Sequence, residues 1–235
     1  MRLLAIETST EYCSCALVLD GEVRESCVKA GHTHSEQLLP MVTRLMTDAG
    51  LRYAQLDAIA FGAGPGSFTG LRIACGAAQG LAFAHALPVV PVSTLEALAS
   101  ATAAPRVLAC LDARMGELYL AAYERDGVDS DWKVVYPPSL VRTDVLPALG
   151  GTWLGVGSGF AAHAAAMAAA YSFVAVEPGL FPRAGAIARL AVGKLEHGEG
   201  VAADLAAPFY LRDKVALDTG EQAALRAVRA EQAAA

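Results

Sequence analysis

Residues 2–28, RLLAIETSTEYCSCALVLDGEVRESCV, establish how the first part of the chain folds. Two largely apolar runs, 2–9 and 12–19, have the length of buried strands, and a third strand-like run covers 22–28. Asp20 and Gly21 separate the second and third runs. Asp-Gly at this spacing is a strong two-residue hairpin signal, because both turn positions favour positive φ. The stretch therefore predicts a meander of three antiparallel strands.

Helices and strands alternate after the meander, and the meander pattern then starts again near Pro105. The first set is predicted as a helix over 35–49 capped by Ser35, a strand over 56–61, a helix over 69–86, a strand over 88–92 and a helix over 94–103. The second set is predicted as strands over 106–111 and 117–123 around a turn at Met115-Gly116, strands near 133–136 and 152–156, and helices at 142–149, 160–170 and 183–197.

Two successive units of this kind predict a two-lobed α/β fold with mixed sheets and flanking helices. This is the layout of the actin, Hsp70 and sugar-kinase group. We expect an N-terminal lobe over 1–103, and a smaller C-terminal lobe over 104–235 that ends in a terminal helix or tail.

The composition limits the classes of partner. The chain has 235 residues, a formal net charge of −6 and no run of four Lys or Arg. A protein that grips nucleic acid by its phosphates needs a concentrated cationic surface, so we expect any contact with nucleic acid to be indirect. The five cysteines contain no CxxC pair, which suits a reducing compartment. Without a secretion signal or a membrane-length apolar stretch, the expected location is the cytoplasm.

Two turns of small residues are candidate remnants of a nucleotide site. ETST (7–10) follows the first strand, and GAGPGSFTG (62–70) joins a strand to a helix, where phosphate-binding loops also lie. The glycine loop matches neither the Walker A pattern nor GxGxxG. A Ser/Thr turn and a tight strand-to-helix turn therefore remain as alternatives. The candidate residues are Glu7, Thr8, Ser9, Gly64, Gly66 and Ser67.

Sequence motifs for catalysis are missing. His32 and His34 lie two residues apart and do not form HExxH, in which the histidines are four apart on one helical face. GxSxG does not occur, and a cysteine–histidine pair would require tertiary proximity. The sequence predicts no catalytic residue, no bound metal and no cofactor.

The helices over 35–49 and 69–86 are candidates for a partner surface. The first has an apolar face wider than packing on its own core requires. The second contains two glycines four residues apart, which permit close approach of another backbone. Tight packing inside the lobe is the alternative for both helices. The candidate residues are Leu38, Met41, Val42, Leu45, Leu71, Arg72, Gly76 and Gly80.

Several segments together resemble the TsaB family, the YeaZ-type relatives of the glycoprotease-like TsaD proteins. They are IETS (6–9), HSEQLLP (34–40), GPGSFTGLR (64–72), PVSTLEAL (91–98), DARMGELY (112–119) and PFYLR (208–212). The order and spacing of these segments are more specific than any one of them.

The resemblance implies a pseudoenzyme subunit that forms a heterodimer with a TsaD-type paralogue and activates it. TsaD transfers a threonylcarbamoyl group from its adenylate to the adenosine beside the tRNA anticodon, so the assembled complex is a threonylcarbamoyltransferase. TsaC makes the adenylate, and a TsaE-type ATPase belongs to the same complex. The isolated chain is expected to form a homodimer.

The metal-binding HxxxH pair of TsaD-type proteins is not formed by His32 and His34, which supports a non-catalytic role. The alternative is a stand-alone enzyme, either an actin-fold kinase or a metallopeptidase. A kinase needs acidic residues for Mg²⁺. Glu7 and Asp112 are the nominees, and GVGSG (155–159) is the only candidate for an adenosine-binding glycine motif.

Overall fold

The computed structural model describes residues 1–127 and 130–212 of the chain. The first sheet and its connections comprise β1 (Arg2–Glu7), β2 (Tyr12–Leu19), β3 (Glu22–Lys29), α1 (His34–Asp48), η1 (Tyr53–Gln55), β4 (Ala58–Gly64), α2 (Phe68–His85), β5 (Val89–Ser93) and α3 (Thr94–Ser100). The remaining elements are β6 (Arg106–Arg114), β7 (Glu117–Glu124), β8 (Lys133–Arg142), β9 (Thr152–Val156), α4 (Gly159–Ala162), α5 (Ala164–Ala170), β10 (Ser172–Glu177), α6 (Ala184–Glu196) and η2 (Ala203–Leu205).

The two sheets have the same topology. The first has the order β3-β2-β1-β4-β5, and the second has the order β8-β7-β6-β9-β10. In each sheet the first three strands of the chain pair antiparallel, and the last two add in parallel. The predicted two-lobed α/β fold with mixed sheets is therefore confirmed, and the common strand order shows that the architecture is duplicated.

The predicted hairpin joins β2 to β3. Asp20 and Gly21 have φ values of 51° and 90°, and Leu19 pairs with Glu22 across the turn. β1, which lies in the middle of this sheet, is buried on both faces apart from its first residue. This explains why its sequence is a continuous apolar run.

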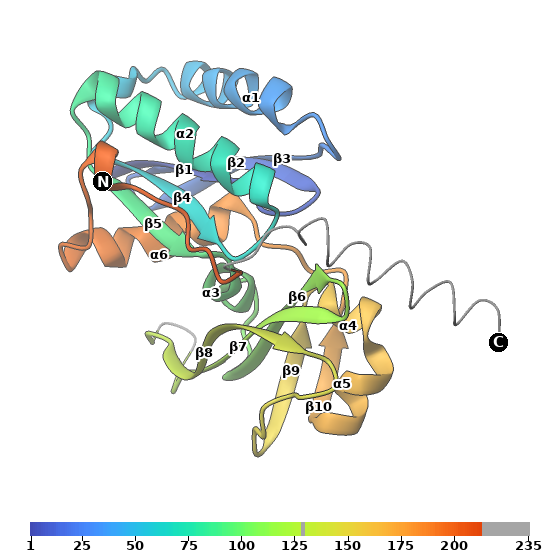
Figure 1. The fold of residues 1–235 in the computed structure, drawn as a ribbon. Coiled ribbons are helices and arrows are strands. Elements are labelled where there is room, and N and C mark those ends of the chain that lie inside the picture. The colour runs from blue at the N-terminus through green and yellow to red at the C-terminus, as the bar shows by residue number, and fades with distance from the viewer. Residues whose placement is uncertain (128–129, 213–235) are drawn as a thin grey trace, which may run out of the picture.

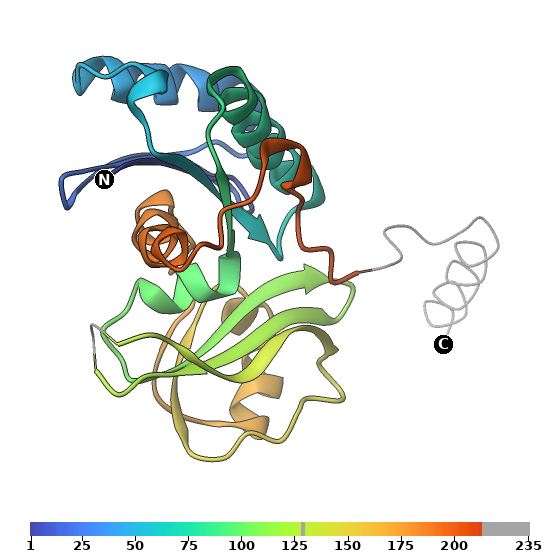
Figure 2. The ribbon, with the colours of Figure 1, turned by 90° about the vertical axis from the view of Figure 1, so that its left-hand side faces the viewer.

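Helices and sheets are stacked in layers (Figure 1). α1 and α2 cover one face of the first sheet and share an apolar core with it. α6 packs on the opposite face of that sheet. Figure 2 shows α3 and α6 between the two sheets, with α4 and α5 on the far side of the second. α6 follows the second sheet in sequence, yet it packs on the first.

Several local predictions need correction. α1 begins at His34, with Thr33 in the N-cap position and no side-chain capping bond, so Ser35 is not its cap. No helix forms over 142–149: β8 ends at Arg142, and a turn and irregular backbone follow it. Leu146 and Leu149 pack against the core of the second sheet from this irregular backbone. β10, whose side chains are mostly exposed, was not predicted.

The assignment of residues 1–103 and 104–235 to separate domains stays a prediction. The terminal helix or tail predicted beyond residue 212 lies outside the described residues. Within the part of the chain that the structure describes, no helix is long and apolar enough to cross a membrane.

Candidate functional site

The turn after β1 is buried and bonded to the glycine loop. Thr8 Oγ1 donates to the carbonyl of Gly70 (2.7 Å), and Ser67 N–H donates to the carbonyl of Ser9 (2.7 Å). Ser67 also caps α2, because its hydroxyl accepts a hydrogen bond from Gly70 N–H (3.4 Å). The structure therefore brings together the candidate nucleotide-site residues, which come from two segments about 60 positions apart in the sequence.

Close approach to this turn explains why three positions of the loop are glycine. A Cβ added at Gly62 would collide with the Glu7 carboxylate, and one at Gly70 would collide with the carbonyl of Thr8. At Gly66 it would lie 2.6 Å from the Cβ of Ser9. Packing of the loop therefore accounts for these glycines, and a nucleotide-binding role for them stays a prediction.

Glu7 is fully enclosed at the base of the turn. Its Oε1 accepts a hydrogen bond from Ser9 N–H (2.5 Å). Among the described residues, its Oε2 and the hydroxyl of Ser9 are buried without a hydrogen-bond partner. Burial raises the pKa of Glu7 to about 7, and hydrogen bonding by Ser9 opposes that rise only in part. Near neutral pH, a large fraction of the Glu7 carboxyl groups is therefore uncharged.

Glu7 should make stability fall with rising pH. Its folded pKa of about 7 lies above the ordinary glutamate value of 4.5, so the folded state binds more protons between these values, and the stability that this proton gives is lost as the pH rises from 4.5 through 7. We expect Glu7→Gln to be more stable than the parent at pH 8, by roughly 3 kcal/mol, with the difference falling below about 1 kcal/mol at pH 5 and vanishing below about pH 4. Urea unfolding at several pH values measures it.

Glu22→Gln, at an exposed position of β3, is the control because it makes the same chemical change on the surface. A constant difference between Glu7→Gln and the parent across the pH range would contradict the prediction.

A cleft of about 890 Å³ lies between the two lobes, beside this turn. Ser9 and Gly66 line it from the first lobe, and Asp112 and Ser158 line it from the second. Residues 209–212 form part of its wall.

Residues 206–212 connect the lobes across the cleft. The carbonyl of Ala206 accepts a hydrogen bond from Gln79 Nε2 on α2 (2.9 Å), and Phe209 N–H donates to the carbonyl of Ala63 (2.7 Å). At the other end Arg212 forms an ion pair with Glu117 of the second lobe. Sequence spacing did not identify this connection. PFYLR (208–212) entered only as part of the family resemblance.

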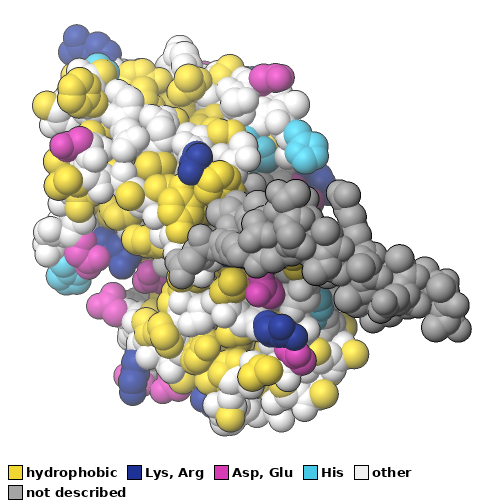
Figure 3. All heavy atoms as spheres, in the orientation of Figure 1, with side chains coloured by type: hydrophobic (Ala, Val, Ile, Leu, Met, Phe, Trp, Pro, Cys, Tyr) yellow, Lys and Arg dark blue, Asp and Glu magenta, His cyan; other side chains and the backbone are white. Residues whose placement is uncertain are grey.

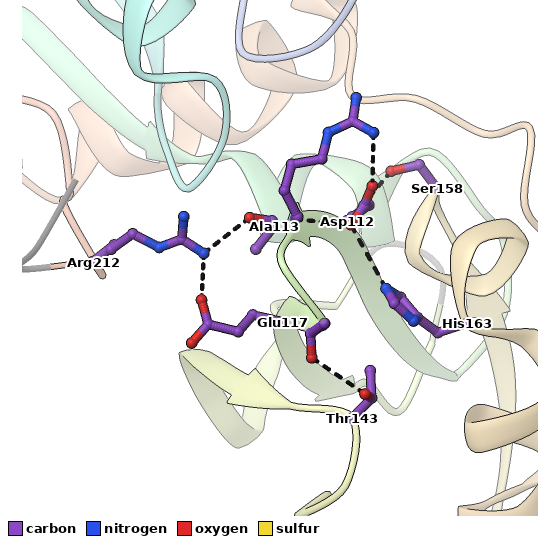
Figure 4. Close-up of polar contacts among 9 residues, drawn as sticks. Asp112, Ala113, Glu117, Thr143, Ser158, His163 and Arg212 are labelled. Atoms are coloured by element: carbon purple, nitrogen blue, oxygen red, sulfur yellow. Dashed lines mark hydrogen bonds and ion pairs between the residues drawn. The ribbon is translucent and has the colours of Figure 1, made fainter. Parts of the chain in front are cut away.

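Asp112, nominated for a kinase, is already engaged by its neighbours. Its carboxylate forms an ion pair with Arg114 (3.1 Å) and has one oxygen 3.7 Å from Nε2 of His163, and its N–H donates to the hydroxyl of Ser158 (3.2 Å). Figure 4 shows Ser158 and His163 beside Asp112, with Arg212 and Glu117 on the other side of the hairpin. With Glu7 buried and Asp112 engaged, neither carboxylate nominated for a kinase is free to bind a Mg²⁺–phosphate complex in the cleft.

The histidines do not gather around a common point. His34 is buried, and its Nε2 lies 2.9 Å from the carbonyl oxygen of Thr10, whereas His32 is exposed. Residues 1–127 and 130–212 contain no cluster of three or more His, Cys, Asp or Glu that could hold a metal ion. The absence of a bound metal stays a prediction.

The candidate partner residues divide between the core and the surface. Leu38, Val42 and Leu71 are buried in the chain's own core, so they present no surface in the isolated chain. Met41 and Leu45 are half-buried at its edge. The candidates exposed on α2 are Arg72, Gly76 and Gly80.

Phe83, which sequence reasoning missed, extends the exposed row on α2 and is 81% exposed. Leu39 on α1, which is half-exposed, was also not predicted. Figure 3 shows mainly hydrophobic and uncharged side chains where α1 and α2 form the surface. The spacing of residues 72, 76, 80 and 83 is that of one helical face, and this signal could have identified Phe83.

Comparison with known proteins connects this architecture to tRNA modification. The family model described as "TsaD: tRNA N6-adenosine threonylcarbamoyltransferase" matches residues 28–136. The tRNA threonylcarbamoyladenosine biosynthesis protein TsaB of Escherichia coli (strain K12) is 39% identical over 224 residues, which cover 92% of this chain and 96% of that relative. The protein of the same name from Haemophilus influenzae is 47% identical over 136 residues, 56% of this chain and 58% of the relative.

A solved structure agrees with the sequence relatives. YeaZ from Pseudomonas aeruginosa matches with a TM-score of 0.83 and 38% identity, covering 89% of this chain and 99% of that chain. The resemblance found in the sequence segments is thus confirmed over nearly the whole length of the Escherichia coli relative. The chain belongs to the TsaB family of tRNA threonylcarbamoyladenosine biosynthesis proteins.

Proposed function

We propose that this chain is a non-catalytic subunit that binds and activates a TsaD-type paralogue in the modification of tRNA to threonylcarbamoyladenosine. The paralogue carries out the threonylcarbamoyl transfer, and the assembled complex is the transferase. A TsaE-type ATPase acts in the same complex. In isolation, the chain forms a homodimer through the surface that otherwise receives the paralogue.

The outer face of α2 carries this proposal. Gly76 and Gly80 are exposed, and a Cβ added at either position would meet nothing within 4 Å. Glycine in a helix interior lowers stability by about 1 kcal/mol relative to alanine. Because no contact inside the described chain requires these two glycines, close approach of another helix is the physical explanation that we favour.

Exposed large side chains lie on α2 on either side of the two glycines, and another lies on α1. Phe83 lies C-terminal to them on the same helix, and Leu39 is exposed on α1. Arg72, at the N-terminal end of the row, stacks on Phe68 with its guanidinium carbon 3.8 Å from the ring centroid. Small residues between exposed anchors are suited to packing of a helix pair against a second helix pair.

The cleft supports the non-catalytic part of the proposal. Glu7 is enclosed and has a pKa of about 7, and Asp112 is paired with Arg114. The direct test is a tRNA modification assay with the TsaD-type paralogue from the same cell, with and without this chain. Modification that proceeds equally well without the chain would exclude an activating role.

The stand-alone enzyme remains the alternative. ATP hydrolysis by the isolated chain tests the kinase form of this alternative, because the proposed assembly subunit should show none. The control is Asp112→Asn, which should not change a background rate that comes from contaminating enzymes.

The paralogue should supply the main tRNA contacts. With a net charge of −6, the isolated chain should bind tRNA only weakly at physiological salt, because few counterions are released. A gel-shift titration of the lone chain, the paralogue and their mixture measures this. Tight, steeply salt-dependent binding by the lone chain would contradict the prediction.

A further inference from the structure

The turn between β6 and β7 has an unusual backbone conformation. Arg114, Met115 and Gly116, here called the hairpin tip, have φ values of 66°, 57° and 76°. L side chains rarely occupy this left-handed region. The register shift between Asp112 and Arg114 marks a bulge, where the left-handed residue is commonly glycine. The two-residue turn that follows normally takes Asn, Asp or Gly.

Packing within the described chain does not explain why Arg114 and Met115 occupy these two positions. The side chain of Arg114 is 85% exposed, and Met115 is 68% exposed. Met115 belongs to neither core cluster of the second lobe. The hairpin thus holds two long side chains in solvent at positions where shorter residues would fold more readily.

Hydrogen bonds from several segments hold the tip in this conformation. Asp112 Oδ1 accepts a bond from Arg114 N–H (2.8 Å). The carbonyl of Gly116 accepts bonds from Thr143 N–H (3.1 Å) and Thr143 Oγ1 (3.2 Å). Arg212 donates to the carbonyl of Ala113 (2.9 Å), next to the tip (Figure 4). Residues in rare backbone conformations persist when their surroundings over-determine them, and such residues cluster at binding and active sites.

We propose that the hairpin tip is a preorganised contact point for a protein partner that offers a carboxylate to Arg114 and an apolar pocket to Met115. The ion pair with Asp112 engages Nη1 of Arg114, and a guanidinium has five N–H donors, so a second carboxylate can be added. Arginine and methionine are both enriched in protein interfaces.

The charges around the tip favour a protein over a nucleic acid. Carboxylates pair with the nearby arginines: Asp144 with Arg142, and Glu117 with Arg212. Among the described residues around the tip, this leaves no concentrated positive field of the kind that binding to phosphates needs. The tip belongs to the second lobe, whereas α1 and α2 belong to the first, and Arg114 faces the N-terminal end of α2 across the cleft that both line. The proposal rests on the proposed function, because it is tested by tRNA modification in the reconstituted complex.

Asparagine substitutions separate the partner contact from the fold. Asn tolerates left-handed φ, so Arg114→Asn and Met115→Asn should each raise the melting temperature of the isolated chain, by about 2 °C. Both should leave heterodimer formation with the TsaD-type paralogue intact. The double variant should lower the rate of tRNA modification by the reconstituted complex by about tenfold. Arg142→Asn, which also removes an exposed arginine paired to a carboxylate, is the control. It should lower neither heterodimer formation nor the rate of tRNA modification.

A photo-crosslinker identifies the class of partner. With benzoylphenylalanine in place of Met115, irradiation of the reconstituted mixture should attach this chain to another protein of the complex. The same group in place of Val145, which is 71% exposed, should not. Heterodimer formation by the same chain is measured in parallel: a missing crosslink with an intact heterodimer contradicts this proposal alone, whereas loss of the heterodimer contradicts the proposed function.

Four outcomes would overturn the proposal: a crosslink to tRNA, a crosslink to a second copy of this chain, loss of heterodimer formation by folded tip variants, or a fully active double variant. A loss of tRNA modification that parallels a fall in the melting temperature of the variants would show that the tip has a structural role. That result would also overturn the proposal.

Discussion

Leucine at Gly80 is expected to abolish binding of the TsaD-type paralogue while the chain stays folded. A Cβ at this position meets nothing within 4 Å in the isolated chain. The larger side chain can therefore project into solvent, and it improves helix propensity by up to about 1 kcal/mol. In the proposed complex the same side chain occupies the space of the partner helix. We expect affinity to fall at least about tenfold and tRNA modification to fall with it.

Sedimentation of the variant, alone and with the paralogue, measures this effect. Homodimerisation of the lone chain should disappear together with heterodimerisation, since we propose that the two use the same surface. Gly193→Leu on α6 is the matched control, because a Cβ there also meets nothing within 4 Å. Unchanged binding by folded Gly76→Leu and Gly80→Leu variants would place the interface elsewhere on the molecule.

Alanine at Gly70 is expected to destabilise the chain strongly. The added Cβ would collide with the carbonyl of Thr8, and neither backbone can easily move away. Thr8 Oγ1 is bonded to the carbonyl of Gly70, and Ser67 N–H is bonded to the carbonyl of Ser9. We expect a loss of roughly 3 kcal/mol, which corresponds to a fall in melting temperature of about 6–12 °C for a chain of this size.

Gly76→Ala in the same helix is the internal control. It makes the same chemical change at a position with open space, so it should raise stability by up to about 1 kcal/mol. Thermal unfolding of both variants gives the comparison. Similar melting temperatures would mean that the β1 turn and the glycine loop are not held as closely together as the structure has them.

The fold was predictable where its signals are local. The three-strand meander, its recurrence after Pro105 and the helices that cover the first sheet follow from apolar periodicity and from turn residues such as Asp20 and Gly21. The false helix at 142–149 arose because Leu146 and Leu149 are spaced as on a helical face, yet they reach the core from irregular backbone. β10 was missed because it is an edge strand with mostly exposed side chains.

The candidate sites were only partly predictable. Apolar spacing on α1 identified Leu38 and Val42, but these residues are buried in the core. The nominated residues exposed on α2 include Gly76 and Gly80, and Phe83 was not nominated. Spacing along one helix defines its faces, but the face that remains exposed depends on which sheet the helix packs against.

Local chemistry along the chain was sufficient for the strand order of the meander, the two-lobed layout and the family resemblance, because residues a few positions apart carry these signals. The close packing of Gly70 on Thr8 and the ion pair of Arg212 with Glu117 join residues 62 and 95 positions apart. Such contacts arise only when the sheets and helices pack together, because no spacing within a single strand or helix encodes them. The strained hairpin tip is of the same kind, since Thr143 and Arg212 hold it from outside β6 and β7.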